Sequence, residues 1–310
     1  MPASRLLTFA PLFFLALIGL SQPVAATSLE ACLDDLAKSP PAEVAQRYTA
    51  LLKAKKLPRE QASWSHYCVG RAWAAADELK QAEPALRAAA KLAQSAEIRN
   101  AVQSFLGSVL FKMNRLDEAE AAHQAELAAA QEMGAAREQA TALNNLGSIA
   151  RQRKQYDQAL ALYTRSLTLQ SDELKKTTVL SNMASVHHEK GNYALAVEVF
   201  QQAIAIDRRL DDRNNLAIHL LNLGSTYLAL RQWKDVNAAL DEGVALARAN
   251  GSRYWEATGL MYGGEALRDD NQPVKARGYL NAALKIFKEI GAAGLVAEVE
   301  QVLSQLGNNK

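Results

Sequence analysis

The sequence predicts an all-α solenoid of about six helix-turn-helix units. Apolar residues recur four before, one before and three after a small anchor residue, as Leu220, Leu223 and Tyr227 do around one of them, which is the spacing of one helix face. Nine residues after an anchor a bulky residue begins the second helix, as Trp233 does. The anchors themselves recur every 37 to 40 residues, at Gly70, Gly107, Gly147, Ala184, Gly224 and Gly264.

The first 26 residues are predicted to be a signal peptide. Arg5 precedes a run of fifteen mostly apolar residues, 6–20, and small residues at 24–26 offer a cleavage site before Thr27. The run is shorter than the roughly 20 residues that a membrane helix needs, and an uncleaved membrane anchor remains the alternative. Cys32 follows Leu29 at lipoprotein spacing, but Glu30 argues against lipidation. We therefore expect an exported protein, periplasmic or secreted, with no membrane insertion after cleavage.

The mature chain divides into a solenoid and two helical caps. Residues 27–58 are predicted to form an N-terminal helical cap, 59–290 the solenoid, and 291–310 a C-terminal capping helix and tail. In the last segment the apolar residues share one helix face, which would cover the end of the stack: Leu295, Val299, Val302, Leu303 and Leu306.

Two cysteines, Cys32 and Cys68, lie in the mature chain. In an oxidising compartment an isolated pair favours a disulfide, and two buried thiols are the alternative. A bond between them would close a loop of about 36 residues and join the first helix to the first repeat, at the end of the solenoid where only one neighbour is present.

The repeat units resemble the tetratricopeptide repeat. Its signature of Leu-Gly, an aromatic residue and then Ala-x3-Phe is similar to Leu223-Gly224 with Tyr227, and to Gly191-Asn192-Tyr193 with Ala196 and Phe200. The resemblance covers roughly residues 60 to 290, with longer spacings than the usual 34. It implies a right-handed α-solenoid that presents a concave groove to a protein partner.

Candidate binding residues follow from helix geometry. Positions two before and one after the anchor lie about 150° from the packed stripe, and in tetratricopeptide solenoids this side lines the groove. A column of amides suits the backbone of an extended peptide, whereas a purely structural column is the alternative. The serines equally suit close packing of small residues. The candidates are Asn145, Asn182, Asn222, Ser148, Ser185 and Ser225, with Arg71 and Arg151 as cations for acidic side chains or as solvated surface residues.

Other function classes lack their signatures. Basic and acidic residues number 35 and 33, without the uncompensated basic stripe that nucleic-acid binding requires. The chain has no phosphate-binding Gly loop, nucleophile elbow or C-x-x-C motif, so we expect no enzyme, catalytic residue or cofactor. His187, His188 and Glu189 are adjacent on a helix and therefore diverge, so no metal site is predicted.

The predicted function is a non-enzymatic interaction scaffold of the cell envelope that binds an extended segment of another protein in its groove. A self-assembling structural element, a homo-oligomer, is the alternative. An enzyme or a small-molecule binder would need a compact polar pocket, which the sequence does not indicate.

Overall fold

The computed structural model describes residues 28–307, and the predicted signal peptide, 1–26, lies outside them. The described residues form fifteen α-helices and no strands, which confirms the all-α prediction. The helices are α1 Leu29–Lys38, α2 Pro41–Ala54, α3 Arg59–Ala75, α4 Leu79–Leu92, α5 Ala96–Lys112, α6 Leu116–Glu132, α7 Ala136–Gln152, α8 Tyr156–Leu169, α9 Glu173–Glu189, α10 Tyr193–Leu210, α11 Arg213–Ala229, α12 Trp233–Ala249, α13 Arg253–Asp269, α14 Pro273–Glu289 and α15 Ala293–Gly307.

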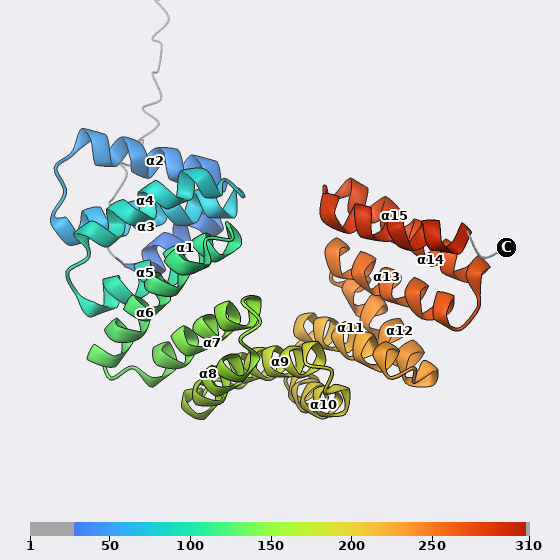
Figure 1. Ribbon diagram of the computed structural model, residues 1–310. Helices are drawn as coiled ribbons and strands as arrows, with labels where there is room; N and C mark the ends of the chain where they lie inside the picture. Colours follow the sequence, from blue (N-terminus) through green and yellow to red (C-terminus); the bar gives the residue numbers. More distant parts are fainter. Residues whose placement is uncertain (1–27, 308–310) are drawn as a thin grey trace, which may run out of the picture.

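The helices pack as six consecutive hairpins, α3/α4 to α13/α14, each against the next along the chain. Odd-numbered helices also contact the odd-numbered helix of the following hairpin. The stack curves so that the odd-numbered helices α7, α9, α11 and α13 line its inner side and the even-numbered helices its outer side (Figure 1). This architecture confirms the predicted solenoid. None of the helices within 28–307 is long and apolar enough to cross a bilayer.

The anchor residues set the distance between the two helices of a hairpin. A Cβ at Gly224 would lie 2.4 Å from Cδ2 of Leu240, and one at Gly147 would lie 2.6 Å from Cε1 of Tyr163. In both units the contact is with the residue sixteen positions after the anchor, so the side chain of the second helix lies directly on the backbone of the first. The fourth unit has Ala184 as its anchor, packed in a cluster with Phe200.

The turn inside each hairpin has one repeated conformation. The residue seven after every anchor has a positive φ, between 57° and 78°. A left-handed residue after a helix lets the following backbone amide bond back to one of the last helical carbonyls. After Lys154, for example, Gln155 N donates to Ala150 O at 2.8 Å. The six residues are Asp77, Asn114, Lys154, Gly191, Arg231 and Asn271.

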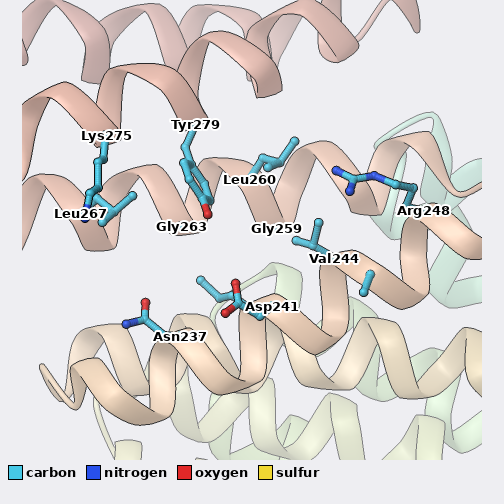
Figure 2. A pocket seen from close by; sticks show the side chains of 12 residues that line it. Asn237, Asp241, Val244, Arg248, Gly259, Leu260, Gly263, Leu267, Lys275 and Tyr279 are labelled. Atoms are coloured by element: carbon cyan, nitrogen blue, oxygen red, sulfur yellow. The ribbon is translucent and has the colours of Figure 1, made fainter.

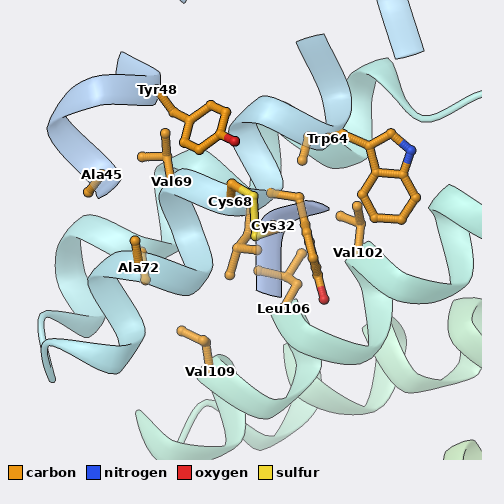
Figure 3. Close-up of a cluster of buried hydrophobic side chains, with 14 of the residues drawn as sticks. Cys32, Ala45, Tyr48, Trp64, Cys68, Val69, Ala72, Val102, Leu106 and Val109 are labelled. Atoms are coloured by element: carbon orange, nitrogen blue, oxygen red, sulfur yellow. A yellow bond between two sulfur atoms is a disulfide. The ribbon is translucent and has the colours of Figure 1, made fainter. Parts of the chain in front are cut away.

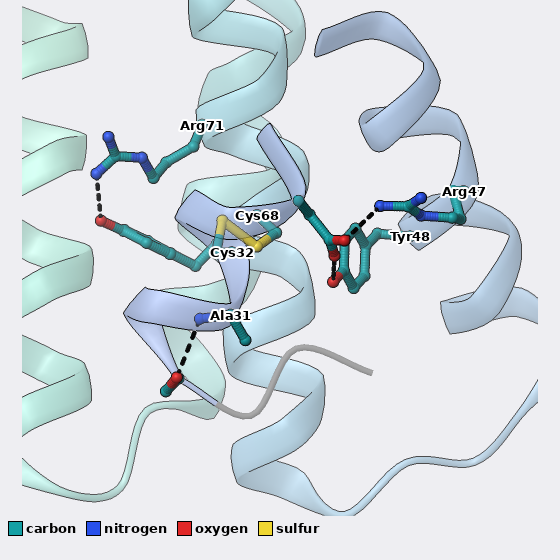
Figure 4. Close-up of a disulfide and its surroundings, with 9 residues drawn as sticks. Ala31, Cys32, Arg47, Tyr48, Cys68 and Arg71 are labelled. Carbon is teal, nitrogen blue, oxygen red and sulfur yellow. Dashed lines mark hydrogen bonds and ion pairs between the residues drawn. A yellow bond between two sulfur atoms is a disulfide. The ribbon is translucent and has the colours of Figure 1, made fainter. Parts of the chain in front are cut away.

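Helices α1 and α2 have the register of a shortened unit before the first full repeat. Counted from Cys32, the buried residues Val44, Tyr48 and Leu51 stand at the offsets of the second-helix core residues in the other units. Asp35 holds the two helices together, since it accepts from the hydroxyl of Tyr48 and pairs with Arg47 at 2.9 Å (Figure 4). Burial, followed by the Asp35 carboxylate, raises the pKa of the Tyr48 hydroxyl.

Candidate functional site

The inner face of the stack is hollowed where four successive odd-numbered helices meet. A cavity of about 350 Å³, which we call the groove cavity, opens between α7, α9, α11 and α13. Its lining is polar except for Ile218 and Trp255. The lining residues are Arg151, Thr178, Ser181, Asn182, Ser185, Asn215, Ile218, His219, Asn222 and Trp255.

A second hollow of about 180 Å³ continues the groove toward the hairpin turns. It shares Arg151, Ser185 and Asn222 with the groove cavity and adds Ser225 and Tyr262. Positions two before and one after the anchors therefore do face the inner side in α9, α11 and α13. The structure brings five of the eight predicted binding residues together here: Arg151, Asn182, Ser185, Asn222 and Ser225.

The three asparagines of the predicted column differ in their contacts. The Asn145 amide lies 3.4 Å from Oε2 of Glu126, a buried residue of α6 in the preceding hairpin. Asn182 donates to Oδ1 of Asn144 at 2.9 Å, which ties α9 to α7. The Asn222 side chain makes no hydrogen bond to a described residue and lines both hollows, whereas its backbone carbonyl accepts from the Thr226 hydroxyl. Its amide is consequently the one of the three that is fully available to a ligand.

The serines of the second column bond mainly within their own helices. Ser148 donates to the carbonyl of Asn144 at 3.1 Å and accepts from the Tyr163 hydroxyl at 3.2 Å. Ser185 donates to the carbonyl of Ser181 at 2.9 Å, and Ser225 lines the second hollow together with Tyr262. Of these, Ser185 and Ser225 line the groove, where their small size leaves room above the backbone.

The two predicted arginines occupy different surroundings. Arg151 lines the groove and pairs with Glu189 of α9 at 2.7 Å, so its charge is balanced. Arg71 donates to the Tyr67 hydroxyl at 3.0 Å, and its guanidinium carbon lies 4.6 Å from the centroid of the Phe105 ring. Arg71 therefore belongs to an aromatic cluster at the N-terminal end and does not line the groove cavity.

The N-terminal end of the inner face is covered by α1. Cys32 of α1 and Cys68 of α3 form a disulfide, with 5.5 Å between their Cα atoms, and both side chains are fully buried (Figure 4). Cys68 stands two before its anchor, the register that Asn182 and Asn222 occupy in the groove. Trp64, Val69 and their neighbours pack around the bond (Figure 3). The open groove consequently begins beyond this unit.

The C-terminal end of the inner face carries a partly buried carboxyl. Glu265 stands one after its anchor, where the preceding unit has Ser225. Burial raises the pKa of Glu265 to about 6, and the Glu298 and Asp269 carboxylates act in the same direction against Arg268. Burial likewise raises the pKa of Tyr262, the groove residue on the preceding turn of α13. This end of the groove is therefore acidic at neutral pH and loses charge near pH 6.

Two groove residues have no sequence signal that identifies them. Trp255 and His219 both line the groove cavity. His219 lies 2.6 Å from Asp207 of α10, and both side chains are almost wholly buried. Asp207 and His219 are twelve residues apart on different hairpins, a separation that matches no ligand motif, so only the packing of α10 on α11 shows the pair.

The outer face has hollows of another kind, between the even-numbered helices. In one of about 430 Å³, Asp241 of α12 and Tyr279 of α14 face each other above Gly259 and Gly263 of α13 (Figure 2). A similar hollow of about 460 Å³ lies between α4, α5 and α6. Because such hollows recur wherever two second helices diverge over a first helix, they follow from the packing of hairpins and do not single out one unit.

Stacked helical hairpins around a polar inner groove define the class of helical-repeat scaffolds. A family model for the tetratricopeptide repeat matches residues 98–172 and 176–249. These residues of the chain are tetratricopeptide repeats, and they lie in the middle of the solenoid. Proteins built from tetratricopeptide repeats are generally non-catalytic scaffolds for protein–protein interaction.

Known proteins share parts of the sequence and the fold. Photosystem I assembly protein Ycf3 of Synechococcus elongatus is 30% identical over 73 residues, which is 23% of this chain and 42% of that protein. The chain thus spans less than half the length of that curated relative.

Solved structures show the same fold over most of the chain. The apo form of RapI superposes with a TM-score of 0.68 at 12% identity, covering 84% of this chain and 96% of RapI. A Rap protein complexed with competence and sporulation factor superposes with a TM-score of 0.62 at 12% identity, covering 89% of this chain and 82% of that one. At these identities the likeness concerns the fold alone.

Proposed function

We propose that this protein is an exported adaptor of the cell envelope that holds an extended segment of another protein in its groove. The observation that carries the proposal is the groove cavity, where amides, hydroxyls and Trp255 converge from four successive helices. Asn222 has an unbonded amide, which offers a donor and an acceptor to a peptide backbone. Trp255 and Ile218 supply the apolar contact that an inserted side chain needs.

Two further observations support a protein or peptide partner. The Rap protein that shares this fold was crystallised with the competence and sporulation factor bound. The groove cavity and the second hollow share Arg151, Ser185 and Asn222 and together are lined by α7, α9, α11 and α13, so they suit an extended segment.

The proposal is tested by removing the groove amides. Residues from Thr27 onward serve as bait in cell-envelope extract, and the captured partner is then divided into overlapping peptides for calorimetric titration. We expect the Asn182→Ala, Asn222→Ala double variant to bind the best peptide about tenfold more weakly, because each lost hydrogen bond is worth roughly 0.5–1.5 kcal/mol. Asn145→Ala is the matched control, since its side chain lies outside the groove cavity and the affinity should stay within about twofold.

The result separates groove binding from the alternatives. Equal affinity of the wild type, the double variant and the control, with all three folded by circular dichroism, would contradict binding in the groove. A concentration-dependent dimer in light scattering, combined with no groove-dependent capture, would instead support a self-assembling structural element.

The proposed export has its own test. Arg5 is followed by a short apolar run, 6–20, and by small residues at 24–26 that offer a cleavage site, a combination typical of a secretory leader. We expect fractionated protein to appear outside the cytoplasm with Thr27 as its first residue, as determined by N-terminal sequencing. Full-length protein in the cytoplasmic fraction would contradict the proposed location.

A further inference from the structure

The turn between α12 and α13 carries the one Asn-Gly pair of the chain, Asn250-Gly251. Both residues are exposed. Asn250 is the C-cap residue of α12, and Gly251 follows it with a φ of 70°. A side-chain amide therefore stands next to a backbone nitrogen whose own residue has no side chain, at a place on the surface that water reaches.

An asparagine that precedes a glycine is chemically reactive, because the next backbone nitrogen attacks the Cγ atom of the amide. A side chain on the following residue crowds this approach. Apart from its chain neighbours, no heavy atom of residues 28–307 lies within 4 Å of the place where a Cβ of Gly251 would stand. In the turns inside the hairpins, by contrast, Asn114 and Asn271 are followed by Arg115 and Gln272. Those two asparagines lack the unhindered nitrogen.

Two other turns between hairpins have the same backbone but an apolar residue in place of the asparagine. Gly134 after α6 and Gly291 after α14 have φ of 64° and 72°. Their amides, like that of Gly251, bond back to the carbonyl three residues earlier. The residue before the glycine is Met133 in one turn and Ile290 in the other, and both are exposed. The conformation of the turn therefore does not account for an asparagine here.

Two hydrogen bonds hold the reacting groups in the folded chain. Nδ2 of Asn250 donates to the carbonyl of Arg213, the first residue of α11, at 3.1 Å. The backbone nitrogen of Gly251 donates to the carbonyl of Arg248, also at 3.1 Å. The residues of both bonds are exposed, and water competes for such bonds, so they slow the attack without preventing it. The first bond also ties the turn to the helix that begins the fifth hairpin.

We propose that Asn250 is a site of spontaneous deamidation, and that its conversion to an acid releases the turn between α12 and α13 from α11. The Gly251 nitrogen loses its proton and bonds to Cγ of Asn250, while the bond from Cγ to Nδ2 breaks and ammonia leaves with that proton. The product is a five-membered succinimide ring. Water then opens the ring at either of its carbonyl carbons. One opening gives aspartate, and the other gives isoaspartate, in which the main chain runs through the side-chain carbons.

The new carboxylate changes both the charge and the contacts of the turn. An ionised carboxylate has no hydrogen to donate, so the carbonyl of Arg213 loses its bond from residue 250. Isoaspartate also lengthens the main chain inside a turn where Ser252 N reaches the carbonyl of Ala247 at 2.9 Å. Deamidation therefore loosens the junction between the fifth and sixth hairpins, just before the helix that supplies Trp255 to the groove cavity. This consequence does not depend on what the groove binds.

The test follows the acid at position 250 over time. The purified chain from Thr27 onward is kept in mildly alkaline buffer, and samples are analysed by ion-exchange chromatography and by mass spectrometry of the tryptic peptide 249–253. We expect an acidic form to accumulate through conversion of Asn250, about tenfold more slowly than in urea, because two hydrogen bonds must open first. Asn114 and Asn271 should remain amides in the same samples.

Two variants connect the chemistry to the turn. Asn250→Met gives this turn the residue that precedes Gly134 in the turn after α6, so it should fold normally and form no acidic species. Asn250→Asp supplies the carboxylate from the start. Amide hydrogen exchange of residues 250–253 is expected to be about tenfold faster in Asn250→Asp than in the freshly prepared wild type, because the bond to Arg213 is missing. Exchange in the turn at Gly134 should be the same in both proteins.

Three results would overturn the proposal. An Asn250 that stays an amide in the folded chain, whether or not the chain in urea is converted, would show that the site does not react in the native protein. An acidic form that appears equally in Asn250→Met would place the reaction at another residue. Equal exchange of residues 250–253 in the wild type and in Asn250→Asp would show that the acid does not release the turn from α11.

Discussion

Phe200→Ala is expected to lower the free energy of unfolding by about 3–5 kcal/mol. Phe200 is 1% exposed and lies in the cluster that joins the fourth hairpin to the fifth, with Ala184, Ile204 and Leu220. The ring fills the space over a small anchor, and α9 and α11 are held in place by helices on either side, so the cavity left behind cannot collapse fully. The measurement is urea unfolding followed by circular dichroism.

The position of Phe200 in the middle of the stack also determines the shape of the unfolding transition of Phe200→Ala. In a solenoid each unit is stabilised only by its neighbours, so a defect in the middle divides the stack into two less coupled parts. We expect the single transition of the wild type to broaden or split. Val274→Ala, at a side chain that is 85% exposed, is the control and should change the stability by less than about 0.5 kcal/mol. A loss below about 1 kcal/mol for Phe200→Ala would contradict the packing described here.

Cys32→Ser, Cys68→Ser is expected to destabilise the N-terminal end by about 3–4 kcal/mol, the value of the chain-entropy model for a loop of this length. Helix α1 packs on α3 through few residues other than the bonded pair, so it should detach when the bond is absent. Hydrogen exchange is expected to accelerate in α1–α3 and to stay unchanged in α9–α13.

Reduction of the wild type provides the control for this experiment. Dithiothreitol should reproduce the exchange pattern of the double variant in the wild type and should have no effect on the variant itself. Slow exchange in α1 after reduction would show that noncovalent packing alone holds this helix, contrary to the expectation.

Local spacing was enough to predict that the three asparagines share one side of their helices. It could not predict which of them bonds to a neighbouring hairpin and which has a free side chain. Asn145, Asn182 and Asn222 share one offset from their anchors, and helix geometry is enough to place them on the same side. Their partners come from neighbouring hairpins: Glu126 for Asn145 and Asn144 for Asn182. Because side-chain packing differs from unit to unit, the same residue is structural in one hairpin and available in another.

The first unit shows the same distinction. The sequence predicts a helical cap at 27–58. In this range the structure has α1 and α2, which keep the register of a repeat, and α1 covers the inner face at Cys68. The first unit is too short to match the repeat spacing in the sequence. Its buried residues Val44 and Tyr48 nevertheless stand at the positions of the second-helix core residues in the other units.

The sequence by itself determined the helices and their pairing into hairpins, and its resemblance to the tetratricopeptide repeat implied which side of each first helix faces inward. These properties depend on contacts between residues three and four apart and on a period that recurs along the chain. Only the tertiary structure decided where the groove is open, which amide is free and that Asp207 meets His219 beneath the cavity. Those features arise from the curvature of the stack and from contacts between hairpins, which no local spacing encodes.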